Sequence, residues 1–237
     1  MALFYRVAEL ILSMETYGRT MEQSAPYLIP NASHVDIVIE SNWSDKKNKY
    51  PNLSDSDGEY LATGYSFYKQ LLRFYGLMLH SSAIVVDDKA YLFTAPSGTG
   101  KSTHTSLWLD LFGDRAFILN DDKPAVRLID DIWYAFGTPW SGKHDISVNT
   151  GVPIAGIAVL ERGDKNEIEP FEGKEAVLSI LKQVNRPKAA ELRIKLLELL
   201  DKLITDVPIW KLKCNMDPEA AIVAYEAMSG EKWEDKI

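Results

Sequence analysis

The sequence of 237 residues contains a single cysteine, Cys214, so it cannot form an internal disulfide framework. It also has no run approaching ~20 uncharged apolar residues, the length that a membrane-spanning helix needs. Its first residues show no basic segment followed by a long apolar run, which is the pattern of a secretory signal peptide. These absences predict a protein of a reducing compartment, the cytoplasm, without a membrane partner.

The sequence also has no excess of positive over negative charge. The chain has 26 Lys and Arg residues against 34 Asp and Glu residues, a formal net charge of −8 at pH 7. This balance argues against a general nucleic-acid binder, although a local basic pocket can still hold phosphate groups. Histidine is scarce, and the spacing of His34, His104 and His144 predicts no zinc site. We expect His104 to be exposed or structural.

The chain does have an apolar content of 46%, enough for a sizeable core, and its patterning suggests three parts. Residues 3–12 and 35–40 are expected to be strands, and the polar stretch 41–57 a solvated loop. Helical periodicity begins at 65–79 and prevails again near the C-terminus. The expected parts are a β-rich lobe over 1–64, a kinase core over 65–170 and a helical C-terminal extension over 171–237.

The most informative segment has the sequence A-P-S-G-T-G-K-S-T and spans 95–103. An apolar run at 90–94 predicts a buried strand before it, and 101–112 predicts a helix after it. Glycines allow the backbone to turn its N–H groups inward, Lys101 supplies a charge for phosphates, and the Ser102 hydroxyl can bind magnesium. The alternative is a glycine-rich turn that binds nothing.

This segment departs at one position from the usual G-x-x-x-x-G-K-[ST] pattern, because Ala95 stands in place of the first glycine. Alanine fits there if its backbone keeps a negative φ. We therefore predict a nucleotide-binding loop with ATP and Mg²⁺ as ligands. Its expected binding residues are Ser97, Gly98, Thr99, Gly100, Lys101, Ser102 and Thr103.

Two adjacent carboxylates, Asp121 and Asp122, follow a predicted strand at 116–120. Phosphoryl transfer needs one carboxylate to hold magnesium and often another to accept a hydroxyl proton. A solvated acidic turn is the alternative interpretation, and Asp87-Asp88 and Asp130-Asp131 are expected to be such turns. The hairpin at Asp130-Asp131 stands where a doubly wound fold would have a crossover helix. We therefore predict an α/β fold with a mixed, partly antiparallel P-loop sheet.

Three further groups are weaker candidates. His80 precedes a strand expected to pair with the phosphate-loop strand, so it could orient a catalytic carboxylate, although a core histidine is the plainer interpretation. The glycine-containing loop 136–144 carries Lys143, which could close over phosphates or simply be a surface lysine. Arg162 could contact phosphate or remain solvated.

Three short motifs taken together resemble the C-terminal domain of HPr kinase/phosphorylase: Leu79-His80-Ser81, the loop 97–103, and Asn120-Asp121-Asp122. The resemblance covers about residues 76–165. ATP-dependent phosphoenolpyruvate carboxykinase is a more distant relative with a similar loop and paired aspartates. The mixed sheet expected from the hairpin agrees with the fold of this group.

The resemblance also implies roles for individual residues. Lys101 and the loop amides would hold the phosphates, and Ser102 with Asp122 would hold magnesium. Asp121 would be the base that activates the acceptor hydroxyl, and His80 would support it. The segment that HPr kinase/phosphorylase uses for phosphorolysis and HPr docking is not found in this sequence. Residues 207–212 and the surrounding helices are more similar to HPr-kinase-like proteins associated with modified-peptide gene clusters.

The function expected from these features is that of an ATP- and Mg²⁺-dependent kinase, a phosphotransferase acting on Ser or Thr of a peptide or small protein. A small-metabolite kinase and a nucleotide-binding sensor module without catalysis are the alternatives, and the retention of both aspartates favours a kinase. A GTPase is disfavoured because Gly142-Lys143-His144-Asp145 has glycine where a guanine reader needs Asn or Thr. Whether the protein forms a homo-oligomer stays open.

Overall fold

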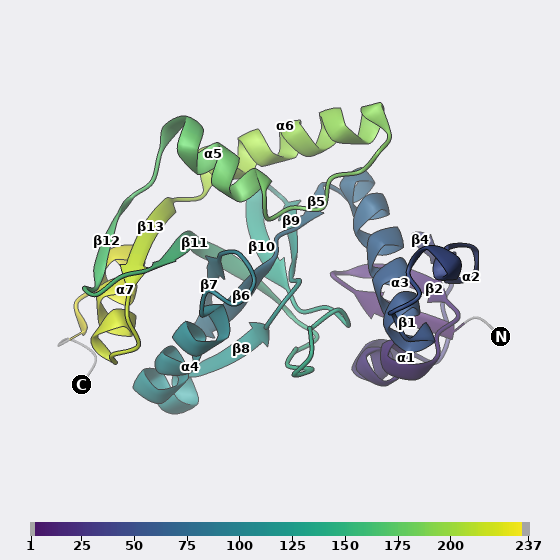
Figure 1. Cartoon of the computed structure of the whole chain (residues 1–237), viewed down its shortest axis with the longest axis horizontal. Coiled ribbons are helices and arrows are strands. Elements are labelled where there is room, and N and C mark those ends of the chain that lie inside the picture. The colour runs from purple at the N-terminus through teal and green to yellow at the C-terminus, as the bar shows by residue number, and fades with distance from the viewer. Residues whose placement is uncertain (1–2, 234–237) are drawn as a thin grey trace.

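The computed structural model describes residues 3–233 (Figure 1). Its N-terminal lobe contains a four-stranded sheet. The strand expected over 3–12 is instead a hairpin, because Ala8 and Glu9 adopt φ angles of 51° and 61°. Two-residue hairpin turns with positive φ usually contain Asn or Gly, and this turn contains neither. In the order β3-β1-β2-β4, the strands are β3 (Leu28–Ile29), β1 (Leu3–Val7), β2 (Leu10–Met14) and β4 (Ile37–Ile39).

Helix α1 (Gly18–Ser24) lies between β2 and β3, and helix α3 (Asp55–Leu71) leads from this lobe to the main sheet. Helix α3 begins ten residues earlier than the helix expected over 65–79, since the Ser54 hydroxyl accepts a hydrogen bond from the Asp57 backbone N–H at 3.0 Å and caps it. The stretch expected as a loop also contains the short helix α2 (Trp43–Lys46). The limit expected between residues 64 and 65 therefore falls inside a helix.

The main sheet has nine strands and is mixed, as the sequence predicts. Strand β11 pairs in parallel with β7 and β13, while β6 pairs antiparallel with both β7 and β8. The turns at Asp87-Asp88 and Asp130-Asp131 join hairpins, with φ angles between 48° and 61°. The strands are β5 (Gly76–Met78), β6 (Ser81–Val86), β7 (Lys89–Thr94), β8 (Ala116–Asn120), β9 (Ala125–Ile129), β10 (Ile132–Phe136), β11 (Gly151–Arg162), β12 (Glu167–Pro170) and β13 (Ile209–Cys214).

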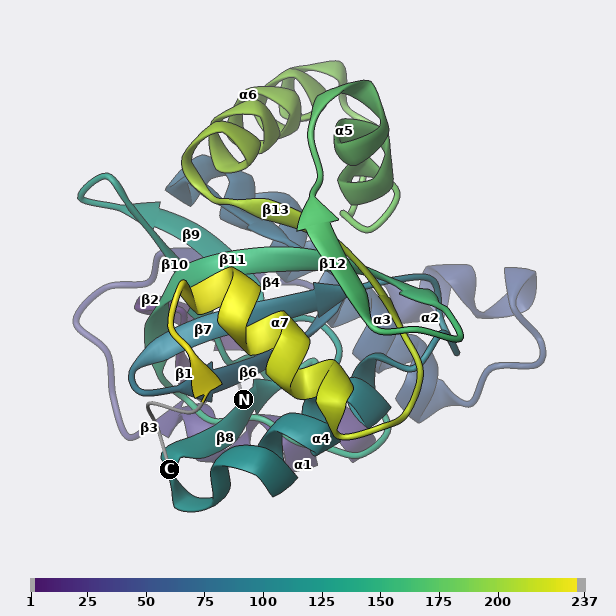
Figure 2. The same cartoon turned by 90° about the vertical axis from the view of Figure 1, so that its left-hand side faces the viewer.

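Helices cover both faces of the central strands (Figure 2). Helices α4 (Lys101–Phe112) and α7 (Glu219–Ser229) pack on one face around Trp108 and Tyr225. Helices α5 (Gly173–Leu181) and α6 (Ala190–Asp206) pack on an apolar cluster that includes Leu196 and Leu200. The C-terminal part is thus more than a helical extension, because β13 extends the sheet by pairing in parallel with β11.

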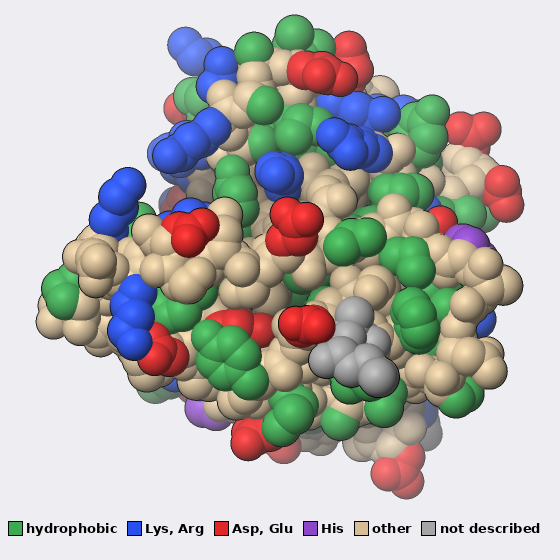
Figure 3. All heavy atoms as spheres, turned by 90° about the vertical axis from the view of Figure 1, so that its right-hand side faces the viewer, with side chains coloured by type: hydrophobic (Ala, Val, Ile, Leu, Met, Phe, Trp, Pro, Cys, Tyr) green, Lys and Arg blue, Asp and Glu red, His purple; other side chains and the backbone are tan. Residues whose placement is uncertain are grey.

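The surface of the N-terminal lobe carries acidic and basic side chains interspersed with apolar ones (Figure 3). Within residues 3–233, no helix combines the length and the apolarity that crossing a bilayer would require.

Candidate nucleotide and phosphoryl-transfer site

The sheet brings three distant segments to one edge. Strand β6 lies between β7 and β8 and runs antiparallel to both, with Ser81 opposite Thr94 and Ala83 opposite Asn120. The carboxyl ends of β7 and β8 and the beginning of β6 therefore share an edge. The predicted phosphate loop, the aspartate pair and His80 meet there, with β6 between β7 and β8.

The phosphate loop has the backbone conformation that its glycines permit. Gly98 and Gly100 have φ angles of 78° and 123°, which L-residues rarely adopt. Ala95 is not among the residues with positive φ, so alanine is compatible with the first position of the pattern. Lys101 is only 8% exposed, and its Nζ donates a hydrogen bond to the Ala95 carbonyl at 3.0 Å. Burial lowers the pKa of Lys101, while the nearby aspartates favour its charged form.

Arg162, at the end of β11, holds this loop from the side. Its Nε donates to the Thr99 carbonyl at 3.1 Å and its Nη2 to the Gly98 carbonyl at 2.6 Å. The sequence allowed two interpretations of Arg162, a phosphate contact or a solvated side chain. The structure shows instead that it braces the loop backbone.

Asn120 turns the chain so that the aspartates leave the strand toward the site. Its Oδ1 accepts hydrogen bonds from the backbone N–H groups of Asp122 at 3.1 Å and Lys123 at 2.8 Å. Asp121 is 8% exposed, and its Oδ1 accepts a hydrogen bond from the Ser82 hydroxyl at 2.7 Å. The local turn thereby lets two adjacent carboxylates line the same cleft.

Asp122 lies in a pair of charged hydrogen bonds. Its Oδ1 is 3.2 Å from His80 Nε2, and its Oδ2 accepts from Lys123 Nζ. Burial opposes ionisation of Asp122, but the His80 hydrogen bond and the Lys123 charge outweigh it and lower the pKa to about 2. His80 is in turn held by Gln183, whose Oε1 is 3.1 Å from His80 Nδ1. His80 thus contacts Asp122, whereas the resemblance placed it in support of Asp121.

The loop containing residues 136–144 links the aspartates to the N-terminal lobe through Gly142. A Cβ at Gly142, whose φ is 81°, would lie 2.8 Å from the Asp122 Cβ. The Gly142 carbonyl accepts hydrogen bonds from Arg19 Nη2 and Gln23 Nε2, and its N–H donates to the Tyr60 hydroxyl. Lys143 follows as an exposed residue of the cleft wall.

Most of the segment 97–103, the aspartate pair, His80 and Gly142 line a cleft of about 720 Å³, a volume in the range of small-molecule sites. One wall is the phosphate loop, and another comes from α1 and α3 of the N-terminal lobe. The protein is acidic overall, yet five cationic side chains line this cleft. They are Arg19, Lys101, Lys123, Lys143 and Arg162.

Several of these residues were missed by sequence analysis. Lys123 directly follows the aspartate pair, so its position alone could have suggested it. Arg19, Tyr60 and Gln183 carry no local motif, because only tertiary packing brings Arg19 and Tyr60 to the cleft and Gln183 to His80. Their recruitment depends on helices α1 and α3 and on the chain that follows α5.

A metal ion at this site would be held by oxygen groups. Magnesium is usually bound by one or two carboxylates together with substrate phosphates and water, and Ser102 with Asp122 suits that donor set. No cluster of three or more His, Cys, Asp or Glu side chains that could hold a metal ion occurs in residues 3–233. His104 is buried and structural: Trp108 Nε1 donates to its Nε2 at 3.1 Å, and burial lowers its pKa to about 3.

Comparison with known proteins gives one family. Residues 59–219 match the sequence model of the family described as SynChlorMet cassette protein ScmC. No curated protein matches the chain. Among solved structures, the HPr(Ser) kinase/phosphatase from Coxiella burnetii matches at 14% identity and a TM-score of 0.34, over 67% of this chain and 95% of that chain. A likeness at this level identifies no activity.

Proposed function

This chain belongs to the ScmC family, and we propose from its site that it is an ATP- and Mg²⁺-dependent kinase acting on a hydroxyl group. One observation carries the proposal. A loop that bears Lys101 and two carboxylates lie together at one edge of the sheet, in a cleft lined by cationic side chains. Ser or Thr of a peptide or small protein is the proposed acceptor.

The phosphate side of the site would bind the nucleotide through backbone and charge. The loop N–H groups and the N-terminus of α4 favour an anion, and Lys101 supplies a buried positive charge beside it. Ser102 and Asp122 would hold magnesium, which neutralises charge on the phosphate oxygens. Lys101 now bonds to the Ala95 carbonyl, so binding would exchange that contact for a phosphate oxygen.

The two aspartates would divide the work according to their surroundings. A carboxyl with a pKa of about 2 is a weak proton acceptor, so Asp122 suits a metal ligand better than a base. Asp121 has no cationic partner within hydrogen-bonding distance among the described residues, and Ser82 fixes one of its oxygens. The other oxygen would accept the proton of the acceptor hydroxyl. His80 would act as a positioning residue for Asp122.

The remaining cations would stabilise the transferring group. Lys143 and Lys123 line the same cleft as the phosphate loop and would neutralise charge on the phosphoryl oxygens. The wall from α1 and α3, including Tyr60 and Leu61, would meet the acceptor, because it lies across the cleft from the phosphate loop.

The test is transfer of γ-labelled phosphate from ATP, with Mg²⁺, to cytosolic extract separated into protein, peptide and metabolite fractions. Label that enters one fraction with the natural protein, and not with Asp121→Asn, supports a kinase and gives the acceptor class. Binding of ATP without transfer to any fraction would favour the alternative, a nucleotide-binding sensor module.

A further inference from the structure

A second cavity, of about 400 Å³, adjoins the phosphate loop. Gly100, Thr103 and Arg162 line both this cavity and the main cleft, so the two lie next to each other around the start of α4. We propose that this second cavity holds the nucleobase and ribose of the nucleotide whose phosphates lie on the loop. The proposal rests on the nucleotide-binding function proposed above and deepens it.

The walls of this cavity are apolar. Leu107 comes from α4, Leu160 from β11, and Met216 from the segment after β13. Met216 is 76% exposed, an unusual position for a large apolar side chain. A flat base inserted between Leu107 and Met216 would cover apolar surface on both of its faces.

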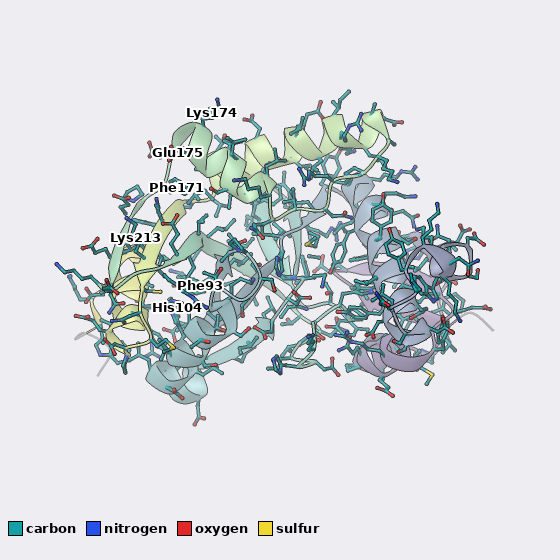
Figure 4. The ribbon with its side chains drawn as sticks, in the orientation of Figure 1. Phe93, His104, Phe171, Lys174, Glu175 and Lys213 are labelled. Carbon is teal, nitrogen blue, oxygen red and sulfur yellow. The ribbon has the colours of Figure 1, made fainter. Side chains whose placement is uncertain are left out.

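The inner end of the cavity is rigid. His104 is buried there and packs edge-to-face on Phe93 of β7, with ring centroids 4.4 Å apart (Figure 4). Both ring nitrogens of His104 have partners, since Trp108 donates to Nε2 and the Cys214 thiol lies 3.9 Å from Nδ1. The low pKa of His104 keeps this ring uncharged near neutral pH.

Several other polar groups of the lining also have partners within the protein, and Thr103 adds an exposed hydroxyl. The Asn215 amide donates to Asp217 Oδ2, and its oxygen accepts from the Asp217 backbone N–H. The backbone N–H of Asn215 donates to Asn166 Oδ1, and that of Gly163 to the Cys214 carbonyl. Arg162 is engaged by the loop carbonyls. The cavity therefore offers contact area to a base and few hydrogen bonds with which to recognise one.

This chemistry has a consequence for the choice of donor. An apolar pocket discriminates weakly between bases, whereas a pocket with hydrogen-bonding groups can reject the wrong ligand by 10⁴-fold or so. We expect ATP and GTP to bind with affinities within about tenfold of each other. Contact with the base would supply affinity for the nucleotide, and the phosphate loop would set the position of the nucleotide.

The test compares Mg²⁺-ATP with Mg²⁺-tripolyphosphate, which has the phosphates and lacks the base, by titration calorimetry on the full chain. We expect the natural protein to bind ATP at least about tenfold more tightly than tripolyphosphate. Leu107→Ala and Met216→Ala should each weaken ATP binding by roughly five- to tenfold and change tripolyphosphate affinity less than about twofold. Because Met216 is exposed, its variant tests the cavity without a risk to folding.

Leu197→Ala is the matched control, since Leu197 is an exposed leucine of α6 that lines neither cavity. The base-site proposal is overturned if ATP binding depends on Lys101 yet is unchanged in both cavity variants, or if tripolyphosphate binds as tightly as ATP. A preference for ATP over GTP above about a thousandfold would overturn the apolar mode of recognition. Failure of the nucleotide-binding function is distinct, because then neither ligand binds, or binding persists in Lys101→Ala.

Discussion

The two walls of the cleft are built in different ways. The phosphate wall comes from one contiguous segment, 95–103, braced by Arg162. The facing wall combines α1, α3 and the loop at Gly142, which are far apart in the sequence. The family match begins at residue 59, within α3, so Arg19 on α1 lies outside it. We infer that the phosphate wall supports nucleotide binding and that the facing wall adapts the site to its acceptor.

The largest effect is expected from Lys101→Ala in the phosphate wall. Loss of its buried charge should weaken Mg²⁺-ATP binding by about a hundredfold or more and abolish transfer. Titration calorimetry measures the binding, with Lys69→Ala as a control because Lys69 is a lysine of α3 that does not line the cleft. Unchanged ATP affinity in Lys101→Ala would remove the phosphate-loop assignment.

Asp121→Asn should separate binding from chemistry. Loss of a general base lowers phosphoryl transfer by about 10²-fold or more, while ATP affinity should stay within about threefold. Single-turnover transfer and ATP titration measure the two effects. The matched variant is Asp122→Asn, which should raise the Mg²⁺ concentration needed for half-maximal transfer. A similar rise in Asp121→Asn would reassign Asp121 to metal binding.

Gly142→Ala should disturb the facing wall and the neighbouring Asp122, and leave the loop 95–103 intact. Its φ of 81° and the contact of the new Cβ with Asp122 require the loop to shift. We expect roughly tenfold lower kcat/KM for the acceptor and about 1–3 kcal/mol lower stability, with ATP affinity nearly unchanged. Gly173→Ala is the control, because its φ is 72° and nothing lies within 4 Å of the added Cβ. If the two variants behave alike, backbone strain rather than the Asp122 contact is responsible.

The smallest effect concerns Glu59, a buried carboxyl of α3 bonded to the Thr20 hydroxyl of α1. Burial raises its pKa from 4.5 to about 7, although the Thr20 hydrogen bond opposes the shift. The folded state thus holds a proton that the unfolded state releases, so stability falls as pH rises from 4.5 to 7. Glu59→Gln should therefore be neutral near pH 4.5 and stabilise by about 2 kcal/mol at pH 8.

Thermal unfolding at the two pH values measures this effect, and Glu22→Gln, on the exposed side of α1, is the control. Nucleotide affinity should not change, because Glu59 does not line the cleft. Equal effects of Glu59→Gln at both pH values would show that the pKa of Glu59 is the same in the folded and unfolded states, contrary to its burial.

The sequence predicted the elements of the main sheet better than those of the N-terminal lobe. Strand β8, the hairpins at Asp87-Asp88 and Asp130-Asp131, and helix α6 follow from strong local periodicity and acidic turns. The β1–β2 hairpin was missed because Ala8-Glu9 forms a left-handed turn without a turn residue. The start of α3 was missed because the Ser54 cap lies in a polar stretch that resembles a loop.

By itself the sequence determined what local chemistry can specify: a glycine-rich loop with Lys101 between a strand and a helix, and adjacent carboxylates after a strand. Those features depend only on residues that are close together along the chain. The tertiary structure decided that His80 contacts Asp122, that Arg162 braces the loop, and that Arg19 reaches Gly142. These contacts depend on strand order and lobe packing, which arise from burial of apolar surface summed over the whole chain and leave no short motif behind.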